Sequence, residues 1–386
     1  MTLPRRVQIA VVGAGPAGST LAAALAMLGR DVALFERKTF PRDKVCGEFL
    51  SPEVTDCLHQ LGCLEAFYEF DPPAMTQSRL TLSDGAELNF SLPGVAYGLS
   101  RTRLDDYLFK IAREKGAQAF DGVAMRGLER GKNGRTKLCL KWGSKRPRRS
   151  PIVEADVVVG AYGRRSAIDR RLGRPFFDER SPYVAFKRHH RIARDADVPS
   201  LDSVVELHAF DGGYCGVSFV EGGRVNVCTM MKRRLLSDDV VDAKAPFESL
   251  AAADTALGRR LATLAPCETK ICTAAQIPLT TKRSSCRDIL FVGDAAGMIA
   301  PLAGDGQAMA MQSALRLAEL LHHHLPRVPR RRWAWLWRRR YEPRIRLGQW
   351  LQGAMIRPRI ANAVAGVLGR IPSLGQQLIA ATRTTR

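Results

Sequence analysis

The strongest constraint on the fold lies in the first 36 residues, where a short apolar strand runs directly into a glycine-rich turn. The strand is predicted over Val7–Val12, and the turn Gly13–Gly18 follows with the spacing Gly-x-Gly-x-x-Gly. A helix of small residues is predicted over Ser19–Leu28, and a second strand over Asp31–Phe35 ends at Glu36. Strand, glycine turn, helix, strand and acidic residue in this order are typical of a Rossmann-type dinucleotide-binding unit.

Each part of this unit has a physical task. Gly13 permits the tight turn, Gly15 lets the backbone approach a pyrophosphate, and Gly18 lets the helix lie close to the strand. The start of the helix offers free N–H groups and a partial positive charge to the phosphates. The carboxylate of Glu36 can accept hydrogen bonds from a ribose diol. The alternative is that the glycine turn is purely structural and binds no nucleotide.

A second signature follows near residue 300. A buried strand is predicted over Asp288–Val292 and ends at Gly293-Asp294, and a loop rich in Pro and Gly then leads into a helix over Gln307–His322. An acidic residue at the carboxyl end of such a strand lies where open α/β sheets bind their ligands. The turn Gly304–Gly306 would present a further helix N-terminus to that ligand.

Together the two signatures resemble the para-hydroxybenzoate-hydroxylase-like superfamily of flavoproteins, over roughly residues 5–325. Within it, the stretch FPRDKVCGEFLSPE at 40–53 looks like the geranylgeranyl-reductase-related branch. The resemblance implies FAD as cofactor and NADPH or NADH as the reductant. It places Glu36 at the adenosine ribose, Asp294 at the ribityl chain, Arg101 beside FAD, and Gly304–Gln307 at the pyrimidine side of the isoalloxazine. The full set of expected cofactor residues is Gly13, Gly15, Ala17, Gly18, Glu36, Arg37, Cys46, Gly47, Arg101, Gly293, Asp294, Pro301, Gly304, Gly306 and Gln307.

Cys46 and Gly47 are expected on a loop that borders both the flavin and the substrate cavity, and Cys46 is the one candidate for a chemical role. The alternative is that Cys46 is a small packing residue. His189 and His190, in contrast, are interpreted as the polar end of a strand, with a catalytic histidine as the less favoured alternative. We expect no metal site, because Cys and His do not occur at zinc spacing.

Three departures from the family patterns bear on the function. Tyr162 stands where the superfamily usually has an acidic residue in its middle motif, which puts a role of that motif in handling NAD(P)H in doubt. The stretch Gly213–Phe219 lacks the Trp and Pro of geranylgeranyl reductases. The string Trp333–Trp337 looks like the WxWxIP motif of flavin halogenases, but it lies in another part of the chain and lacks Ile-Pro, so we interpret it as a coincidence.

The expected fold class is α/β (α+β overall), in three parts. A discontinuous Rossmann-type FAD-binding domain is expected over residues 1–77, 98–175 and 285–325. An antiparallel substrate-binding sheet is expected over 78–97 and 176–284, with a hairpin turn at Asp84-Gly85. A basic helical region is expected over 326–386.

The charge of the chain is concentrated in that last part. Residues 326–386 hold fourteen arginines and one acidic residue, Glu342, and so carry +13 of the net +21. The segment 330–341 mixes arginines with Trp333, Trp335 and Trp337, a pattern that suits an anionic membrane surface. A helix that packs its indoles on the domain is the alternative. Nucleic acid is the least favoured partner, since no nucleic-acid-binding fold accompanies the basic segment.

Two enzyme hypotheses remain. The favoured one is an FAD-dependent monooxygenase that hydroxylates an apolar aromatic or polyketide- or lipid-like substrate with NAD(P)H and O₂. The alternative is a reductase of isoprenoid double bonds. A non-catalytic flavin-binding protein is the alternative from another class. Without a signal peptide or a membrane-spanning apolar run in the sequence, we expect a cytoplasmic protein, with contact to the inner face of a membrane left open.

Overall fold

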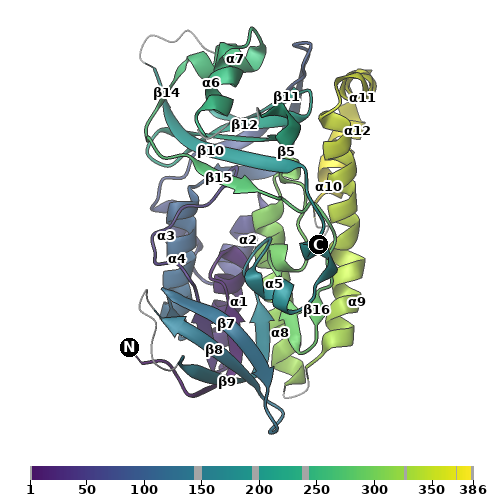
Figure 1. The fold of residues 1–386 in the computed structure, drawn as a ribbon. Helices are drawn as coiled ribbons and strands as arrows, with labels where there is room; N and C mark the ends of the chain where they lie inside the picture. Colours follow the sequence, from purple (N-terminus) through teal and green to yellow (C-terminus); the bar gives the residue numbers. More distant parts are fainter. Residues whose placement is uncertain are drawn as a thin grey trace.

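Two β-sheets with surrounding helices make up the structure, a computed structural model that describes residues 2–142, 150–193, 200–236, 243–325, 328–370 and 372–383 (Figure 1). The first sheet lies in the lower half of Figure 1 and the second in the upper half, and the last helices run along one side of both. The predicted class, α/β with a Rossmann-type unit, an antiparallel sheet and a helical C-terminal part, is confirmed.

The first sheet is built on five parallel strands in the order β17-β9-β1-β2-β6. A short strand, β16, pairs antiparallel with β17, and the hairpin β7-β8 joins through β8 to β9. The bounds are β1 Arg6–Val12, β2 Val32–Phe35, β6 Gln118–Phe120, β7 Val123–Arg130, β8 Thr136–Trp142, β9 Ile152–Gly160, β16 Ser285–Cys286 and β17 Ile289–Phe291.

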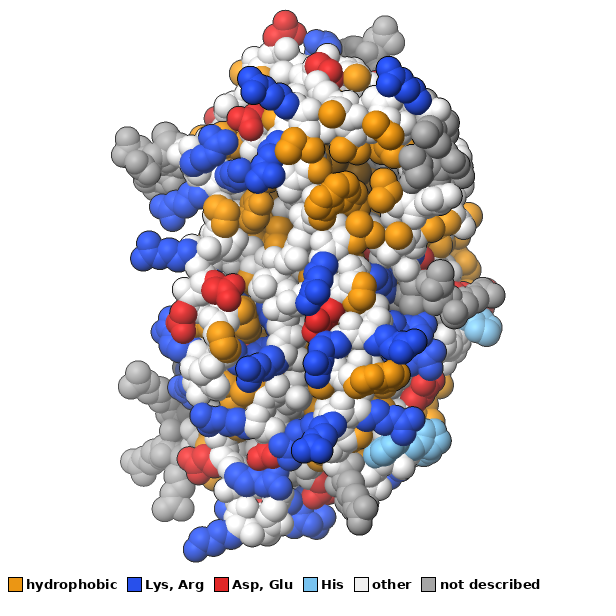
Figure 2. All heavy atoms as spheres, turned by 90° about the vertical axis from the view of Figure 1, so that its right-hand side faces the viewer, with side chains coloured by type: hydrophobic (Ala, Val, Ile, Leu, Met, Phe, Trp, Pro, Cys, Tyr) orange, Lys and Arg blue, Asp and Glu red, His pale blue; other side chains and the backbone are white. Residues whose placement is uncertain are grey.

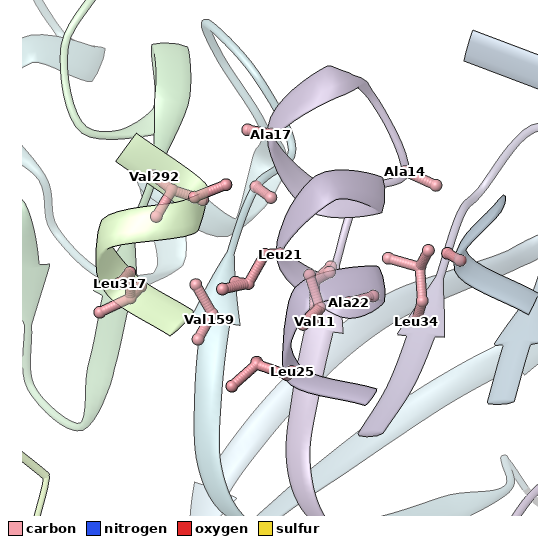
Figure 3. Packing of buried hydrophobic residues seen from close by; sticks show 14 of the residues in the cluster. Val11, Ala14, Ala17, Leu21, Ala22, Leu25, Leu34, Val159, Val292 and Leu317 are labelled. Carbon is pink, nitrogen blue, oxygen red and sulfur yellow. The ribbon is translucent and has the colours of Figure 1, made fainter. Parts of the chain in front are cut away.

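Helix α1 (Pro16–Met27) lies on this sheet between α8 (Gly306–His324) and α4 (Arg101–Glu114). Figure 3 shows Leu21 and Leu25 of α1 packed toward the strands that carry Val11 and Val159. The helix begins at Pro16, three residues before the predicted start, because proline is well tolerated in the first turn of a helix, where its missing N–H costs nothing.

The second sheet is mostly antiparallel and runs β14-β10-β13-β12-β11-β4-β5-β3, with β15 also paired to β10. Among the described residues, β11 and β4 are the one parallel pair of this sheet. The bounds are β3 Phe49–Leu50, β4 Ala74–Thr81, β5 Glu87–Gly98, β10 Tyr183–Ile192, β11 Ser203–Phe210, β12 Gly213–Val220, β13 Arg224–Lys232, β14 Leu264–Pro266 and β15 Cys272–Ala275.

This sheet takes in residues outside the ranges expected for a substrate-binding part. Strand β4 begins at Ala74, and β3, which pairs with β5, comes from the loop after Cys46. A two-residue strand has no readable alternation of its own, and its pairing depends on a partner far along the chain. The loop expected to border the flavin is therefore hydrogen-bonded directly into the second sheet.

The chain ends in four consecutive helices, which lie along both sheets on the right of Figure 1. None of the helices in the described part of the chain has both the length and the apolar character needed to cross a bilayer. Residues 326–327, 371 and 384–386 of the expected basic region lie outside the described residues. The bounds are α9 Arg330–Arg340, α10 Glu342–Met355, α11 Pro358–Arg370 and α12 Pro372–Ala381; the shorter helices are α2 Glu53–Gln60, α3 Leu64–Tyr68, α5 Ala167–Arg171, α6 Ala245–Ala252 and α7 Ala256–Ala262.

Helix α9 packs its aromatic stripe on the first sheet. Trp333 and Trp337 are fully buried and Tyr341 nearly so, and the Trp333 indole N–H donates a 3.0 Å hydrogen bond to the Phe291 carbonyl oxygen. These indoles cannot reach lipid headgroups, whereas Trp335 stays exposed. Membrane contact through 330–341 therefore stays a prediction. Of this segment, Trp335 and the arginines are the residues that could contact a membrane.

Candidate functional site

The glycine turn between β1 and α1 has the geometry that its spacing predicts. Gly13 has φ +103°, and a Cβ at this position would lie 2.6 Å from the Ala161 carbonyl oxygen. A Cβ at Gly18 would lie 1.8 Å from the Gly13 carbonyl oxygen, so only glycine lets the helix come this close. At Gly15, in contrast, the nearest atoms are guanidinium nitrogens 3.8 and 3.9 Å away, and this leaves open space over the turn.

That open space has the polarity of an anion site. Gly15 is the N-cap of α1 and supplies no side-chain cap, so the first amides of the helix stay free for a ligand. The two guanidinium groups facing it belong to Arg101 and Arg42. A pyrophosphate therefore fits this cradle in both shape and charge, and its binding there stays a prediction.

Arg101 and Arg42 converge on one buried carboxylate. Asp105 accepts hydrogen bonds of 2.8 and 2.7 Å from Arg101 and lies 2.9 Å from Arg42. Burial opposes charge on Arg101, but Asp105 outweighs it and raises the pKa of the guanidinium. Arg101 was expected here from the family resemblance. Arg42 was not, although it lies in the same loop as Cys46.

Glu36 follows β2 and points back to the turn. Its buried carboxylate accepts 3.0 Å hydrogen bonds from the backbone amides of Ala14 and Lys38, and it lies 3.6 Å from Arg42. A carboxylate held this rigidly suits the expected contact with a ribose diol, which stays a prediction. Arg37, the next residue, is exposed.

Gly293 and Asp294 follow β17 in a short 3₁₀ turn. Gly293 lies against α1, since a Cβ there would be 2.9 Å from the Cβ of Ala17. The two expected signatures are therefore in direct contact. The small side chain of Ala17 allows Gly293 to come this close to α1.

Asp294 lies among three cations that the sequence did not single out, Lys44, Arg164 and Lys282. Burial is the largest cause that lowers the pKa of each, to about 8 for Lys44 and about 7 for Lys282, and the charge of Asp294 works against it. Lys282 also donates 2.7 Å hydrogen bonds to the carbonyl oxygens of Asp294 and Arg164. These cations come from three separate loops, so no local motif reveals them.

The turn at 304–307 leads into α8 beside the loop after Cys46. Gly304 has φ +69°, and a Cβ there would lie 3.0 Å from the ring of Phe49. Gly306 is the first residue of α8, whose N-cap Asp305 makes no side-chain cap. Gln307 donates from Nε2 to the Phe49 carbonyl oxygen at 3.3 Å, while its buried Oε1 has no hydrogen-bond partner among the described residues. A buried acceptor without a donor fits a bound ligand at this point.

Cys46 and Gly47 lie where the expected flavin side meets a cavity. The Cys46 sulfur accepts from the Glu48 amide at 3.4 Å, and the Cys46 carbonyl oxygen accepts from Asn226 at 3.2 Å. Gly47 is exposed at the cavity wall, with nothing within 4 Å of an added Cβ. The loop is thus held to β13 of the second sheet.

A buried ionic cluster fixes the end of this loop. The Glu48 carboxylate, which is fully buried, lies 2.7 Å from the Lys187 ammonium and 2.6 Å from His189 Nε2, and it accepts a 2.8 Å hydrogen bond from the Arg101 amide. Lys187 also lies 2.6 Å from Asp43. Burial opposes charge on Lys187, but the two carboxylates prevail and raise the pKa of the ammonium.

His189 and His190 lie near the end of β10, as the sequence predicted, but both are buried and not exposed polar residues. His189 meets the Glu48 carboxylate. Burial, followed by the nearby Arg188, lowers the pKa of His190 to about 4. The register of β10 against the loop, which the sequence does not reveal, decides this difference.

An apolar cavity of about 290 Å³ lies between the second sheet, the two expected flavin loops and the last helices. Its wall includes Cys46 and Gly304 on the flavin side and Met355 of α10 on the other. The exposed Trp350 lines it as well, so the cavity reaches the surface there. Pro301, expected at the cofactor, also lies on this wall, and the polar side chains among the lining residues are Ser78, Arg164, Tyr214, Ser218, Thr382 and Arg383.

Comparisons with known proteins agree with this arrangement. The model of a family described as "FAD binding domain" matches residues 6–330. The menaquinone reductase of Mycobacterium tuberculosis is 30% identical over 83% of the chain and 78% of its own length.

Among solved structures, the myxobacterial chondrochloren halogenase has a TM-score of 0.78 at 21% identity, over 91% of this chain and 83% of its own. A geranylgeranyl bacteriochlorophyll reductase-like protein from Thermoplasma acidophilum has a TM-score of 0.72 at 18% identity, over 91% and 88%. At these identities the two structures show a shared fold and nothing about the reaction.

Proposed function

Because the chain belongs to the FAD-binding family of oxidoreductases whose model spans residues 6–330, we propose that it is an FAD-dependent reductase of a double bond in a lipid-like isoprenoid substrate, such as a prenylated quinone. The observation that carries the proposal is the apolar cavity that extends from Cys46 and Gly304 to Trp350. A long apolar molecule could place one segment at the flavin side and leave its remainder along the last helices. The likeness to a menaquinone reductase and the loop at 40–53 both support this substrate class.

The residues of the expected cofactor site fit FAD. The cradle over Gly15 offers space for the pyrophosphate, and the arginines beside it offer positive charge. The Oε1 of Gln307, which has no partner among the described residues, offers a hydrogen-bond acceptor. FAD, reduced by NADPH or NADH, would supply a hydride to one carbon of the double bond, and a proton must reach the other carbon.

The chain has to supply that proton from the cavity wall. Cys46, Tyr214 and Cys228 are the lining residues that carry a thiol or phenol proton. Burial raises the pKa of Tyr214 and of Cys228, so both hold their protons at neutral pH. Cys46 lies on the loop nearest the expected flavin site, and we propose it as the proton donor. The apolar remainder of the wall would exclude water from the reacting carbons.

Hydroxylation remains the second candidate, and the same cavity is the observation in its favour. A wall with few polar side chains would protect an oxygen-transferring flavin from water. In that case the oxygen atom comes from O₂ and no proton is added to carbon.

One experiment separates the two. The flavin-loaded protein is incubated with NADPH or NADH and a prenylated quinone, once without oxygen and once under ¹⁸O₂, and the lipid is analysed by mass spectrometry. After the quinone ring has been reoxidised, a retained gain of two hydrogens in the isoprenoid chain supports the reductase, and incorporation of ¹⁸O supports the hydroxylase. If neither product forms and the flavin is not reoxidised by the lipid, the proposed substrate class is wrong.

Two variants test the proton donor. Cys46→Ala should slow product formation by about tenfold or more, because a positioned acid contributes at least that factor. Cys267→Ala, at an exposed cysteine outside the cavity wall, serves as the control. Equal rates of product formation in both variants would show that Cys46 is not the proton donor.

A further inference from the structure

The outer sides of α10 and α11 form an exposed surface that is both apolar and basic. Trp350, Ile360 and Val367 are 56%, 41% and 49% exposed, which is unusual for large apolar side chains. Four exposed arginines accompany them, Arg346, Arg357, Arg359 and Arg370. These seven residues are called the outer face below.

Apart from Trp350, which also lines the cavity, the outer-face residues are not among the side chains that line it. Arg346 and Trp350 are one helical turn apart on α10, and Ile360 and Val367 are two turns apart on α11. The inner sides of the same helices carry cavity-lining residues, among them Met355, Ala361, Val364 and Leu368. The two helices are therefore apolar on both sides, and their exposed arginines lie on the outer side, whereas the buried Arg344 of α10 points inward to Asp305.

Positive charge on the outer face is almost unopposed by acidic residues of its own helices. Glu342 is the one acidic residue in 328–370, and it lies 3.6 Å from Arg346 at the start of α10. Within the described ranges, Arg357, Arg359 and Arg370 make no ion pair. Charges left without a carboxylate in their own chain are free to meet anions outside it.

The cavity opens at this same surface. Trp350 is both part of the outer face and part of the cavity wall. Figure 2, which views this side of the molecule, shows apolar side chains gathered around a hollow in the upper part, with Lys and Arg below and beside them. A ligand that leaves the cavity here emerges among indole and aliphatic side chains, not into a polar surface.

From this arrangement we propose that the outer face docks on an anionic lipid bilayer and that the cavity receives its ligand directly from that bilayer. Trp350 would lie at the level of the headgroups, Ile360 and Val367 would enter the acyl boundary, and the arginines would bind lipid phosphates. A second copy of the chain is a poor occupant, because a two-fold interface would set arginines against arginines. The proposal moves the membrane contact from the indoles of α9, which are buried, to α10 and α11.

The docking proposal can be tested independently of the proposed reaction, because its test measures binding to vesicles and not turnover. Full-length, flavin-loaded protein is floated with vesicles of pure phosphatidylcholine or of phosphatidylcholine with phosphatidylglycerol. We expect binding to the anionic vesicles that weakens with added salt, and little binding to the neutral ones. No binding to anionic vesicles would overturn the proposal.

Paired variants locate the surface. Arg357→Gln with Arg359→Gln, and Ile360→Ser with Val367→Ser, should each reduce the bound fraction by about tenfold or more. Trp142→Ser and Ile152→Ser are the controls, since these residues are 41% and 53% exposed but lie on β8 and β9 of the first sheet. Circular dichroism and the flavin spectrum confirm that each variant is folded.

Three further results would contradict the assignment. Equal losses in the control variants would mean unspecific adhesion. Loss of binding in Trp335→Ser, with the outer-face variants unchanged, would return the contact to α9. A dimer in solution that Val367→Ser dissociates would assign the outer face to a second copy of the chain.

Discussion

The guanidinium of Arg344 on α10 lies 2.5 Å from the carboxylate of Asp305, the residue between Gly304 and Gly306 at the expected flavin site. Both side chains are buried. Asp305 also accepts a 3.0 Å hydrogen bond from Ser51, and Arg344 donates a 2.8 Å hydrogen bond to the Thr382 carbonyl oxygen. The last helices are thus tied through one ion pair to the turn that leads into α8, and they are part of the site.

Replacing Arg344 by methionine should destabilise the protein strongly. Burial raises the pKa of Asp305, and Arg344 works against this, so its loss leaves a buried carboxylate without its cation. We expect a loss of about 3–5 kcal/mol in the free energy of unfolding, measured by urea denaturation. The control is Arg346→Met, because the Arg346 side chain is 72% exposed and its pair with Glu342 should contribute less than about 1 kcal/mol. Similar losses of unfolding free energy in the two variants would show that the buried pair stabilises the protein no more than the exposed one.

Gly15 and Gly18 should respond differently to alanine. A methyl group at Gly18 meets the Gly13 backbone, and we expect Gly18→Ala to lower folding yield. A methyl group at Gly15 meets no protein atom closer than 3.8 Å, so Gly15→Ala should fold but bind FAD at least about tenfold more weakly. Flavin titration measures this, with Gly353→Ala as a helix control that has open space around it. Unchanged affinity in Gly15→Ala would place the pyrophosphate elsewhere.

Lys187 should be needed for the loop that carries Cys46. Lys187→Met would leave Glu48 and Asp43 without their shared cation, which should cost about 3–5 kcal/mol of unfolding free energy. The exposed Lys110, paired with Asp106 at 2.7 Å, supplies the control Lys110→Met. Thermal unfolding of both variants gives the comparison. A Lys187→Met protein as stable as the control would show that Lys187 does not hold the loop that carries Cys46.

Lys282 should make stability depend on pH between about 7 and its ordinary pKa of 10.5. Its folded pKa is lowered, so over this range the unfolded chain holds a proton that the folded protein does not. Stability is therefore full above the ordinary pKa and falls as pH drops toward 7. Between pH 7 and 10 the unfolding free energy of the wild-type protein should therefore rise relative to that of Lys282→Met as pH increases. Equal pH slopes in the two proteins would argue against the lowered pKa.

The parts that sequence predicted well are those in which a few neighbouring residues determine the backbone. The positive φ at Gly13 and the close approach at Gly18 follow from local spacing, and so does the strand that leads to Asp294. For the same reason the two signatures were sufficient to indicate the family before the second sheet was known.

The missed residues depend on contacts between distant segments. Arg42 meets Asp105 and Lys187 meets Glu48 only once the two sheets are assembled. One signal was available: Lys187 and His189 are two residues apart in a strand, so they point to the same side and need an anion there. The aromatic stripe of α9 was found by its helical spacing, but spacing does not distinguish a protein core from a lipid surface.

The order in which the chain visits its two sheets has a consequence for folding. It builds β1 and β2 in the first sheet, passes to β3–β5 in the second, returns for β6–β9, leaves again for β10–β15, and closes the first sheet with β16 and β17. Neither sheet is complete until almost three quarters of the chain has been made, and pairings such as β9 with β17 join residues more than a hundred positions apart. Such non-local pairing slows folding and leaves strand edges open in the meantime. No single cut can therefore release a folded half, and fragments from a nick in the loops between sheets should remain associated.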